Sequence, residues 1–135
     1  MRIRVISSRE EIDSIRPSEK MVHLAFRASN VDFLKLMQKS PRLQAVQIPP
    51  SYMKTMSKAI GVFLEMQGVK LLEGDVWGHR KDIDEYFTVP DDALTAIKSL
   101  AGQGVSPEEL AKEVQKSAKL GSDLINYIAK AETLA

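Results

Sequence analysis

The chain has 135 residues, a hydrophobic fraction of 44% and a charged fraction of 27%, values typical of one globular domain that buries its own core. It has no cysteine, which excludes disulfides, thiolate metal sites and a cysteine nucleophile. No apolar run approaches the ~20 residues needed to cross a bilayer, and the first ten residues lack the apolar segment of a signal peptide. We therefore expect a cytoplasmic protein.

The net charge of +1 hides only a small asymmetry between the two parts of the chain. Residues 1–87 carry 14 Lys and Arg against 11 Asp and Glu, whereas residues 88–135 carry 5 against 7. Proteins that bind nucleic acid usually show a clear basic excess on the contact face. The charge balance therefore weighs against nucleic-acid binding without excluding a local basic patch.

Residues 1–87 show the pattern of an alternating α/β domain. Four stretches are predicted to be strands, namely residues 2–6, 21–26, 43–48 and 69–72. Three stretches between them are predicted to be helices, namely residues 8–16, 29–39 and 51–67. This order predicts an α/β fold with an open parallel four-stranded sheet, flavodoxin- or Rossmann-like, in an α/β/α arrangement. The strands recur at intervals of roughly 19–25 residues, so a leucine-rich-repeat-like solenoid is the alternative, but its repeat pattern is absent.

The predicted helices have clear start signals. The first is expected to begin with a capping box formed by Ser8 and Glu11, and the second to begin at Ser29 or Asn30. The inward face predicted for the second helix comprises Val31, Phe33, Leu34 and Met37. The third is expected to run from a Ser51 cap to Gly68. Its predicted inward stripe comprises Tyr52, Met56, Ala59 or Ile60, Phe63, and Met66 or Gln67.

Residues 88–135 are predicted to form a three-helix C-terminal segment that packs on the α/β domain. Ser106 followed by Pro107 is a strong start signal for its second helix. The first two helices look like those of a helix-turn-helix domain, although the turn around residues 115–117 lacks the usual glycine. The candidate nucleic-acid-binding residues at and after this turn are Lys116, Lys119, Ser122 and Asn126. The other interpretation is a helical cap or a dimerisation element, because apolar and small residues recur at steps of four and three.

The stretch from Leu71 to Phe87 gathers unusual residues after the last predicted strand. Its candidate ligand-binding residues are Glu73, Asp75, Trp77, His79, Arg80 and Asp82. Carboxylates beside a histidine can bind a divalent cation or act in acid–base chemistry, and open α/β sheets bind ligands at the carboxyl ends of their strands. No established metal-ligand spacing is present, which leaves the metal unknown and favours a charged loop with Trp77 in the core.

Other chemistries find little support. Ser7, Ser8 and Arg9 follow the first strand at a helix N-terminus and could hold a small anion, but a simple helix cap is the favoured interpretation. This turn has no glycine and the chain has no P-loop, so we expect no nucleotide cofactor. No nucleophile elbow is present either. His23 lies inside the second strand and is expected to be a core residue. A non-enzymatic protein without a cofactor is therefore favoured.

Three stretches resemble signature stretches of an uncharacterised family of small archaeal proteins, mostly from methanogens, known only as a domain of unknown function. They are Met21-Val-His-Leu-Ala-Phe, Ile48-Pro-Pro-Ser-Tyr-Met-Lys-Thr and Leu71-Leu-Glu-Gly-Asp-Val-Trp-Gly-His-Arg-Lys-Asp-Ile. The resemblance covers nearly the whole chain and implies an archaeal cytoplasmic protein. The resemblance implies no activity and no catalytic residues.

A second resemblance is to the flavodoxin-like outer domain of D-2-hydroxyacid dehydrogenases. Residues 34–46 and 67–75 are similar to its helix–Pro–x–Leu–strand and Gly–Val–strand phrases. The domain that carries the glycine fingerprint and the catalytic residues is absent from this sequence. The resemblance implies a strand order of 2-1-3-4 and no dehydrogenase activity.

Together these observations predict a non-enzymatic regulatory or interaction module, with DNA binding through the C-terminal helices as its most specific form. The alternative is a small-molecule- or metal-binding α/β protein with its site between Glu73 and Asp84. A purely structural interpretation predicts a homodimer through the helix at 51–67 or through the C-terminal helices.

Overall fold

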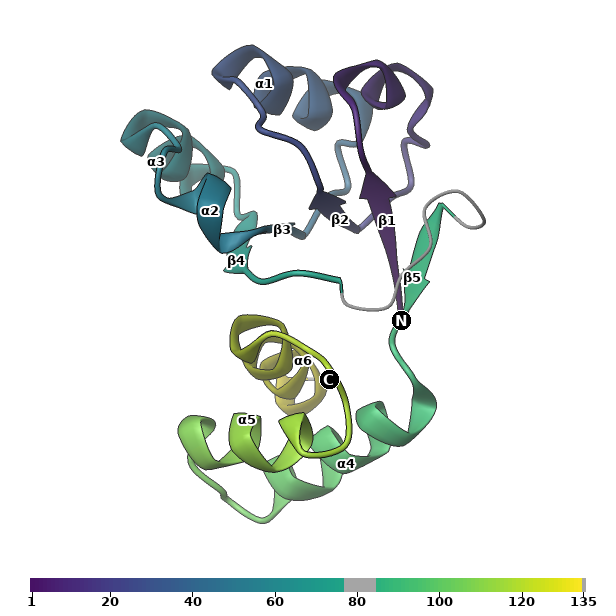
Figure 1. Ribbon diagram of the computed structural model, residues 1–135, viewed down its shortest axis with the longest axis vertical. Helices are drawn as coiled ribbons and strands as arrows, with labels where there is room; N and C mark the ends of the chain where they lie inside the picture. The colour runs from purple at the N-terminus through teal and green to yellow at the C-terminus, as the bar shows by residue number, and fades with distance from the viewer. Residues whose placement is uncertain (77–84, 135) are drawn as a thin grey trace.

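The computed structural model describes residues 1–76 and 85–134, with side chains described up to residue 131 (Figure 1). The elements in chain order are β1 (Arg2–Ile6), the 3-10 helix η1 (Arg9–Ser14), β2 (Met21–Leu24), α1 (Asn30–Lys39), β3 (Ala45–Ile48), α2 (Pro50–Met53), α3 (Lys58–Met66), β4 (Lys70–Glu73), β5 (Tyr86–Thr88), α4 (Asp91–Gly102), α5 (Pro107–Gln115) and α6 (Ser122–Leu134). The alternating α/β half and the three C-terminal helices are as predicted. The short strand β5 was not predicted.

The five strands form one mostly parallel sheet in the order β4-β3-β2-β1-β5. The first four strands are parallel, and β5 pairs antiparallel with β1, with Phe87 opposite Ile3. The predicted order 2-1-3-4 is therefore wrong, because the parallel strands follow one another across the sheet without a reversal. This consecutive order is the one that the solenoid alternative implies. Since crossovers between parallel strands are right-handed, three steps in one direction place all the crossover helices on one face.

The first face of the sheet carries η1, α1 and α3, which Figure 1 shows together on one side. Alternate residues of the strands point to this face and share a core with the helices, since successive side chains of a strand face opposite ways. The buried members of this core are Ile6, Ile12, Ile15, Val22, Leu24, Phe33, Leu36, Leu43, Val46, Ile48, Ile60, Leu64 and Val69.

The second face is covered by α4, α5 and α6, which lie on the opposite side of the sheet in Figure 1. Each parallel strand contributes one residue to this second core: Ile3, Met21, Ala45 and Leu72. The main helical members are Ala93, Ile97, Leu110, Val114, Leu124, Ile125 and Ile128. The three layers of an α/β/α arrangement are thus present. The second helical layer, however, is supplied by the C-terminal helices and not by crossovers.

Two helices in the first half differ from the predictions. The helix predicted at 51–67 is interrupted, because Pro50 begins α2 and Ser57 caps α3 by accepting a hydrogen bond from the Ala59 N–H. Met66 is 77% exposed, although it was placed on the inward stripe. In α1, Val31 and Leu34 are also exposed, while Leu36 is buried. The packing surface of α1 is therefore rotated from the predicted face toward Phe33 and Leu36.

The C-terminal helices largely follow their predicted signals. The side chain of Ser106 caps α5 by accepting from the Glu109 N–H, with Pro107 at the first helical position. Gly121 directly precedes α6. Pro90 precedes α4 as its cap residue, with Asp91 and Asp92 in the first turn. Within the described part of the chain, the helices lack the combined length and apolar character that a membrane-crossing segment requires.

Candidate functional site

The predicted site after β4 is described only in part. Glu73 and Asp75 lie at the carboxyl end of β4, and both are exposed. The other four predicted residues, Trp77, His79, Arg80 and Asp82, lie outside the described residues. What the structure shows of this site is therefore how Glu73, Asp75 and their neighbours meet the sheet and the C-terminal helices.

Asp75 lies beside a buried polar pair on the second face of the sheet. His23 of β2 and Gln47 of β3 are opposite each other in the parallel register, and both are fully buried. His23 Nδ1 and Gln47 Oε1 are 2.9 Å apart, and His23 Nε2 lies 3.7 Å from Asp75 Oδ1. The described residues provide no hydrogen-bond partner for Gln47 Nε2. A row of polar groups therefore runs from the buried sheet to the exposed end of β4.

The start of α6 docks directly on the end of β4. The Glu73 N–H donates a hydrogen bond of 2.8 Å to Asp123 Oδ2 in the first turn of α6. A Cβ atom added to Gly121 would lie 3.2 Å from the Glu73 carbonyl oxygen and 3.3 Å from Gly74 Cα. A Cβ added to Gly74 would lie 2.7 Å from Gln47 Nε2. Because Gly74 and Gly121 have no Cβ, the backbone at the end of β4 approaches the backbone at the start of α6 closely, next to the buried His23–Gln47 pair.

This end of the sheet shows little of the geometry of a ligand site. The consecutive order of the parallel strands provides no reversal point, which is where open α/β sheets form their ligand crevice. Within residues 1–76 and 85–131, no group of three or more His, Asp or Glu side chains could hold a metal ion. Among the residues described, the contacts after β4 join the end of this strand to the start of α6.

The predicted anion-binding residues are engaged by carboxylates of the chain itself. Glu11 Oε2 accepts hydrogen bonds from the N–H groups of Ser7 and Ser8 and from the Ser7 hydroxyl. Arg9 Nη2 lies 3.3 Å from Asp32 Oδ2. Burial disfavours the ionised form of Glu11, but the Ser7 and Ser8 hydrogen bonds outweigh it and hold the pKa of Glu11 below its usual value. The anion bound at this turn is therefore the Glu11 carboxylate.

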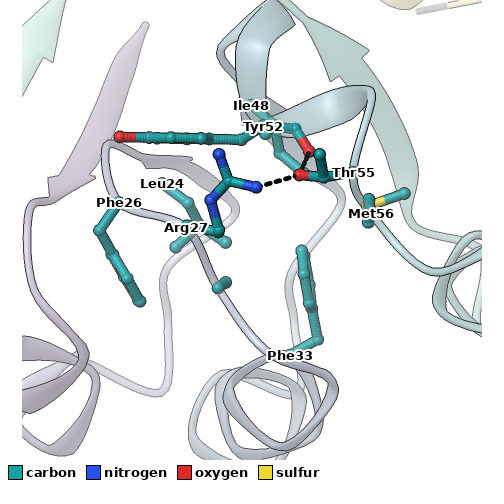
Figure 2. A pocket seen from close by; sticks show the side chains of 9 residues that line it. Leu24, Phe26, Arg27, Phe33, Ile48, Tyr52, Thr55 and Met56 are labelled. Atoms are coloured by element: carbon teal, nitrogen blue, oxygen red, sulfur yellow. Dashed lines mark hydrogen bonds between the residues drawn. The ribbon is translucent and has the colours of Figure 1, made fainter.

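A small hollow lies at the carboxyl ends of β2 and β3, where sequence analysis had placed no site. Figure 2 shows Arg27 between Tyr52 and Thr55. The guanidinium donates to the Thr55 hydroxyl at 2.6 Å and lies 5.4 Å from the centre of the Tyr52 ring. The enclosed volume of the hollow is only about 20 Å³, far below the ~300–1,000 Å³ of typical ligand pockets. Its only cation among the lining residues is Arg27, which is already engaged by its neighbours.

The three C-terminal helices pack against one another, and α6 lies between the sheet and the pair α4 and α5 (Figure 1). The predicted residues Lys116, Lys119 and Ser122 are exposed, and Asn126 is half-buried. Lys116 Nζ pairs with Glu113 at 2.8 Å. Ser122 and Asn126 are four residues apart in α6, so they lie on one side of the helix, whereas Lys119 lies in the turn before it.

The polar side of α6 borders an open groove of about 260 Å³ beside β4. One wall is formed by Lys70, Leu71 and Leu72 of β4. The other is formed by residues of α6, namely Asp123, Asn126, Tyr127 and Lys130. The structure therefore places an edge strand directly alongside the polar side of α6.

Two family models match the chain, one described as the N-terminal domain of a family of unknown function, DUF1699, over residues 2–85. The chain belongs to the DUF1699 family. The second model is described as the C-terminal helix-turn-helix domain of DUF1699 proteins and matches residues 93–130, which span most of α4, all of α5 and most of α6. No curated protein and no solved structure matches this DUF1699 chain significantly. The predicted resemblance to an uncharacterised family is confirmed, and so is the helix-turn-helix character of the C-terminal segment.

Sequence reasoning missed two residues that organise this DUF1699 structure. Gln47 appeared only as one position of a strand, and its contact with His23 depends on the pairing of β2 with β3. Asp123 was not singled out, although an acidic residue in the first turn of a helix is a local signal for a bond to a nearby N–H. That this N–H belongs to Glu73, fifty positions earlier, follows only from the tertiary structure.

Proposed function

We propose that this protein is a DNA-binding regulator that contacts duplex DNA through α4, α5 and α6. The observation that carries the proposal is the mutual packing of these helices within the matched helix-turn-helix segment. In such domains the second helix supports a third helix that lies in the major groove. Lys119, Ser122 and Asn126 lie at or near the start of α6, the end from which a recognition helix contacts base edges.

These side chains can contact both bases and phosphates of DNA, but the number of such contacts is small. An asparagine amide can bind an adenine edge with two hydrogen bonds, and lysines neutralise phosphates. Residues 88–135 nevertheless carry five Lys against seven Asp and Glu. Because non-specific affinity comes from phosphate contacts, we expect weak binding that falls further as the salt concentration rises.

Fluorescence anisotropy with a labelled duplex at ~50 and ~200 mM salt tests this proposal. Lys119→Ala should weaken binding and reduce the salt slope by about one, the contribution of one phosphate contact. Lys58→Ala, on α3 at the other face of the sheet, should leave both unchanged. In an Asp123→Ala variant, α6 loses its hydrogen bond to β4. The proposal is overturned if this variant and the wild-type chain both fail to bind DNA at ~50 mM salt.

A second candidate function is binding of a divalent cation or small ligand at the end of β4. It is favoured by the Asp75 carboxylate, which lies beside fully buried His23 and Gln47. A ligand that binds only the folded state raises the melting temperature. Asp75→Asn should abolish a rise produced by Mg²⁺, Mn²⁺ or Zn²⁺, whereas Asp91→Asn should preserve it. Melting temperatures that none of these ions changes would eliminate this candidate.

A further inference from the structure

We propose that β4 holds α6 in an autoinhibited position, and that DNA binding requires the start of α6 to leave β4. This inference rests on the proposed DNA-binding function and concerns the regulation of the same helix. It is carried by the contacts that Asp123 and Gly121 make with the end of β4.

The docked end of α6 is the end that a helix-turn-helix protein needs free. In such proteins the N-terminal residues of the recognition helix contact base edges. Here Asp123 accepts the Glu73 N–H, and Gly121 approaches the Glu73 carbonyl and Gly74 Cα so closely that a Cβ would crowd both. The first turn of α6 therefore faces the protein's own strand.

The side of α6 is obstructed as well. A helix with its side chains is ~10–12 Å across and the major groove is ~12 Å wide, so a recognition helix nearly fills the groove. Lys70, Leu71 and Leu72 of β4 line the same groove as Asn126 and Lys130 of α6. α6 therefore cannot enter the major groove of a duplex while β4 lies beside it.

The closed arrangement is favoured by a shared apolar core. Leu124, Ile125 and Ile128 of α6 are buried together with Ala45 and Leu72 of the sheet. Separation would expose apolar surface on both sides, which costs free energy in proportion to the area exposed. The apparent DNA affinity of the full chain is therefore reduced by the fraction of molecules in which α6 is free.

A matched pair of substitutions at Asp123 separates release of α6 from simple electrostatics. Asp123→Asn and Asp123→Ala both remove a negative charge from the start of α6, but only asparagine keeps an acceptor for the Glu73 N–H. We expect the alanine variant of the full chain to bind a labelled duplex about three- to tenfold more tightly than the asparagine variant, the effect of one hydrogen bond. Equal affinities of the two variants would overturn the inference.

A second pair tests the backbone contact without a change of charge. Gly121→Ala places a methyl group against the Glu73 carbonyl, whereas Gly102→Ala, at the end of α4, meets no atom within 4 Å. The first should raise DNA affinity and the second should not. Amide hydrogen exchange at Glu73 reports release directly, because it should accelerate in Asp123→Ala and remain slow in Asp123→Asn.

The outcomes also distinguish this inference from the function on which it rests. If wild type and all variants bind DNA equally well, α6 is not inhibited while DNA binding stands. If no chain binds at ~50 mM salt, both the function and the inhibition are overturned, whatever hydrogen exchange shows at Glu73.

Discussion

His23 and Gln47 face each other across β2 and β3, with His23 Nδ1 and Gln47 Oε1 2.9 Å apart and both side chains fully buried. A buried polar group that loses its partner keeps its desolvation cost, ~1–3 kcal/mol, without compensation. We therefore expect Gln47→Met, which preserves volume, to lower the free energy of unfolding by ~1–3 kcal/mol in urea denaturation. Gln44→Met at an exposed neighbouring position should change it by less than ~0.5 kcal/mol. Equal stability of the two variants would show that the pair is dispensable.

Gly74 and Gly102 are predicted to respond in opposite directions to alanine. At Gly74 the new Cβ would lie 2.7 Å from Gln47 Nε2, so Gly74→Ala should destabilise the fold by ~1–3 kcal/mol through overpacking. At Gly102, the last residue of α4, a Cβ meets nothing within 4 Å. Gly102→Ala should therefore be neutral or stabilise by up to ~1 kcal/mol, because alanine loses less conformational entropy on folding. Thermal melts of both variants check this contrast, and a neutral Gly74→Ala would contradict it.

Glu11 should make stability depend on pH. Since hydrogen bonds from Ser7 and Ser8 hold its folded-state pKa below the unfolded value of ~4.3, ionised Glu11 stabilises the fold above that pH. The contribution is lost as pH falls through the folded-state pKa. Glu11→Gln should thus cost about 1 kcal/mol at pH 7 and progressively less below pH ~4.

Denaturation of wild type and Glu11→Gln across this pH range measures the difference. Glu10→Gln, a substitution of the exposed neighbouring carboxylate, serves as the control and should stay within ~0.5 kcal/mol of wild type. A stability difference for Glu11→Gln that is the same at pH 7 and pH 3 would show that hydrogen bonds to the ionised carboxylate do not stabilise the turn.

Self-association through the region predicted as helix 51–67 stays a prediction, now centred on α3. Val62 and Met66 are 56% and 77% exposed and lie one helical turn apart. We expect light scattering to give a dimer mass for wild type and a monomer mass for Val62→Ser/Met66→Ser. Val31→Ser on α1, where another valine is exposed, should leave the mass unchanged. A wild-type chain that remains monomeric at the highest concentration measured would make the prediction wrong.

Signals that act between near neighbours in the chain were sufficient for most elements. Ser29 accepts from the Asp32 N–H, Ser106 accepts from the Glu109 N–H, and Gly68 has the positive φ of a helix C-terminus. Each of these contacts spans at most a few residues, so the local sequence contains both partners. The positions of α1, α5 and the four parallel strands followed from such signals.

Two of the errors arose because the deciding partner lies far away in the chain. Tyr86 to Thr88 form a strand of three residues, too short to produce a period-two pattern, and become a strand only by pairing with β1. The inward face of α1 depended on where the sheet lies beneath it, which is why Val31 and Leu34 were misplaced.

By itself, the sequence determined that this chain has an α/β half, three C-terminal helices with a helix-turn-helix pattern, and no cysteine chemistry. Only the tertiary structure decided the strand order, the burial of His23 against Gln47, and the docking of Asp123 on Glu73. The physical reason is the range of the interactions. Caps and periodicity act within one or two turns of chain, whereas strand order and the covering of a sheet face are selected by apolar burial among segments distant in sequence.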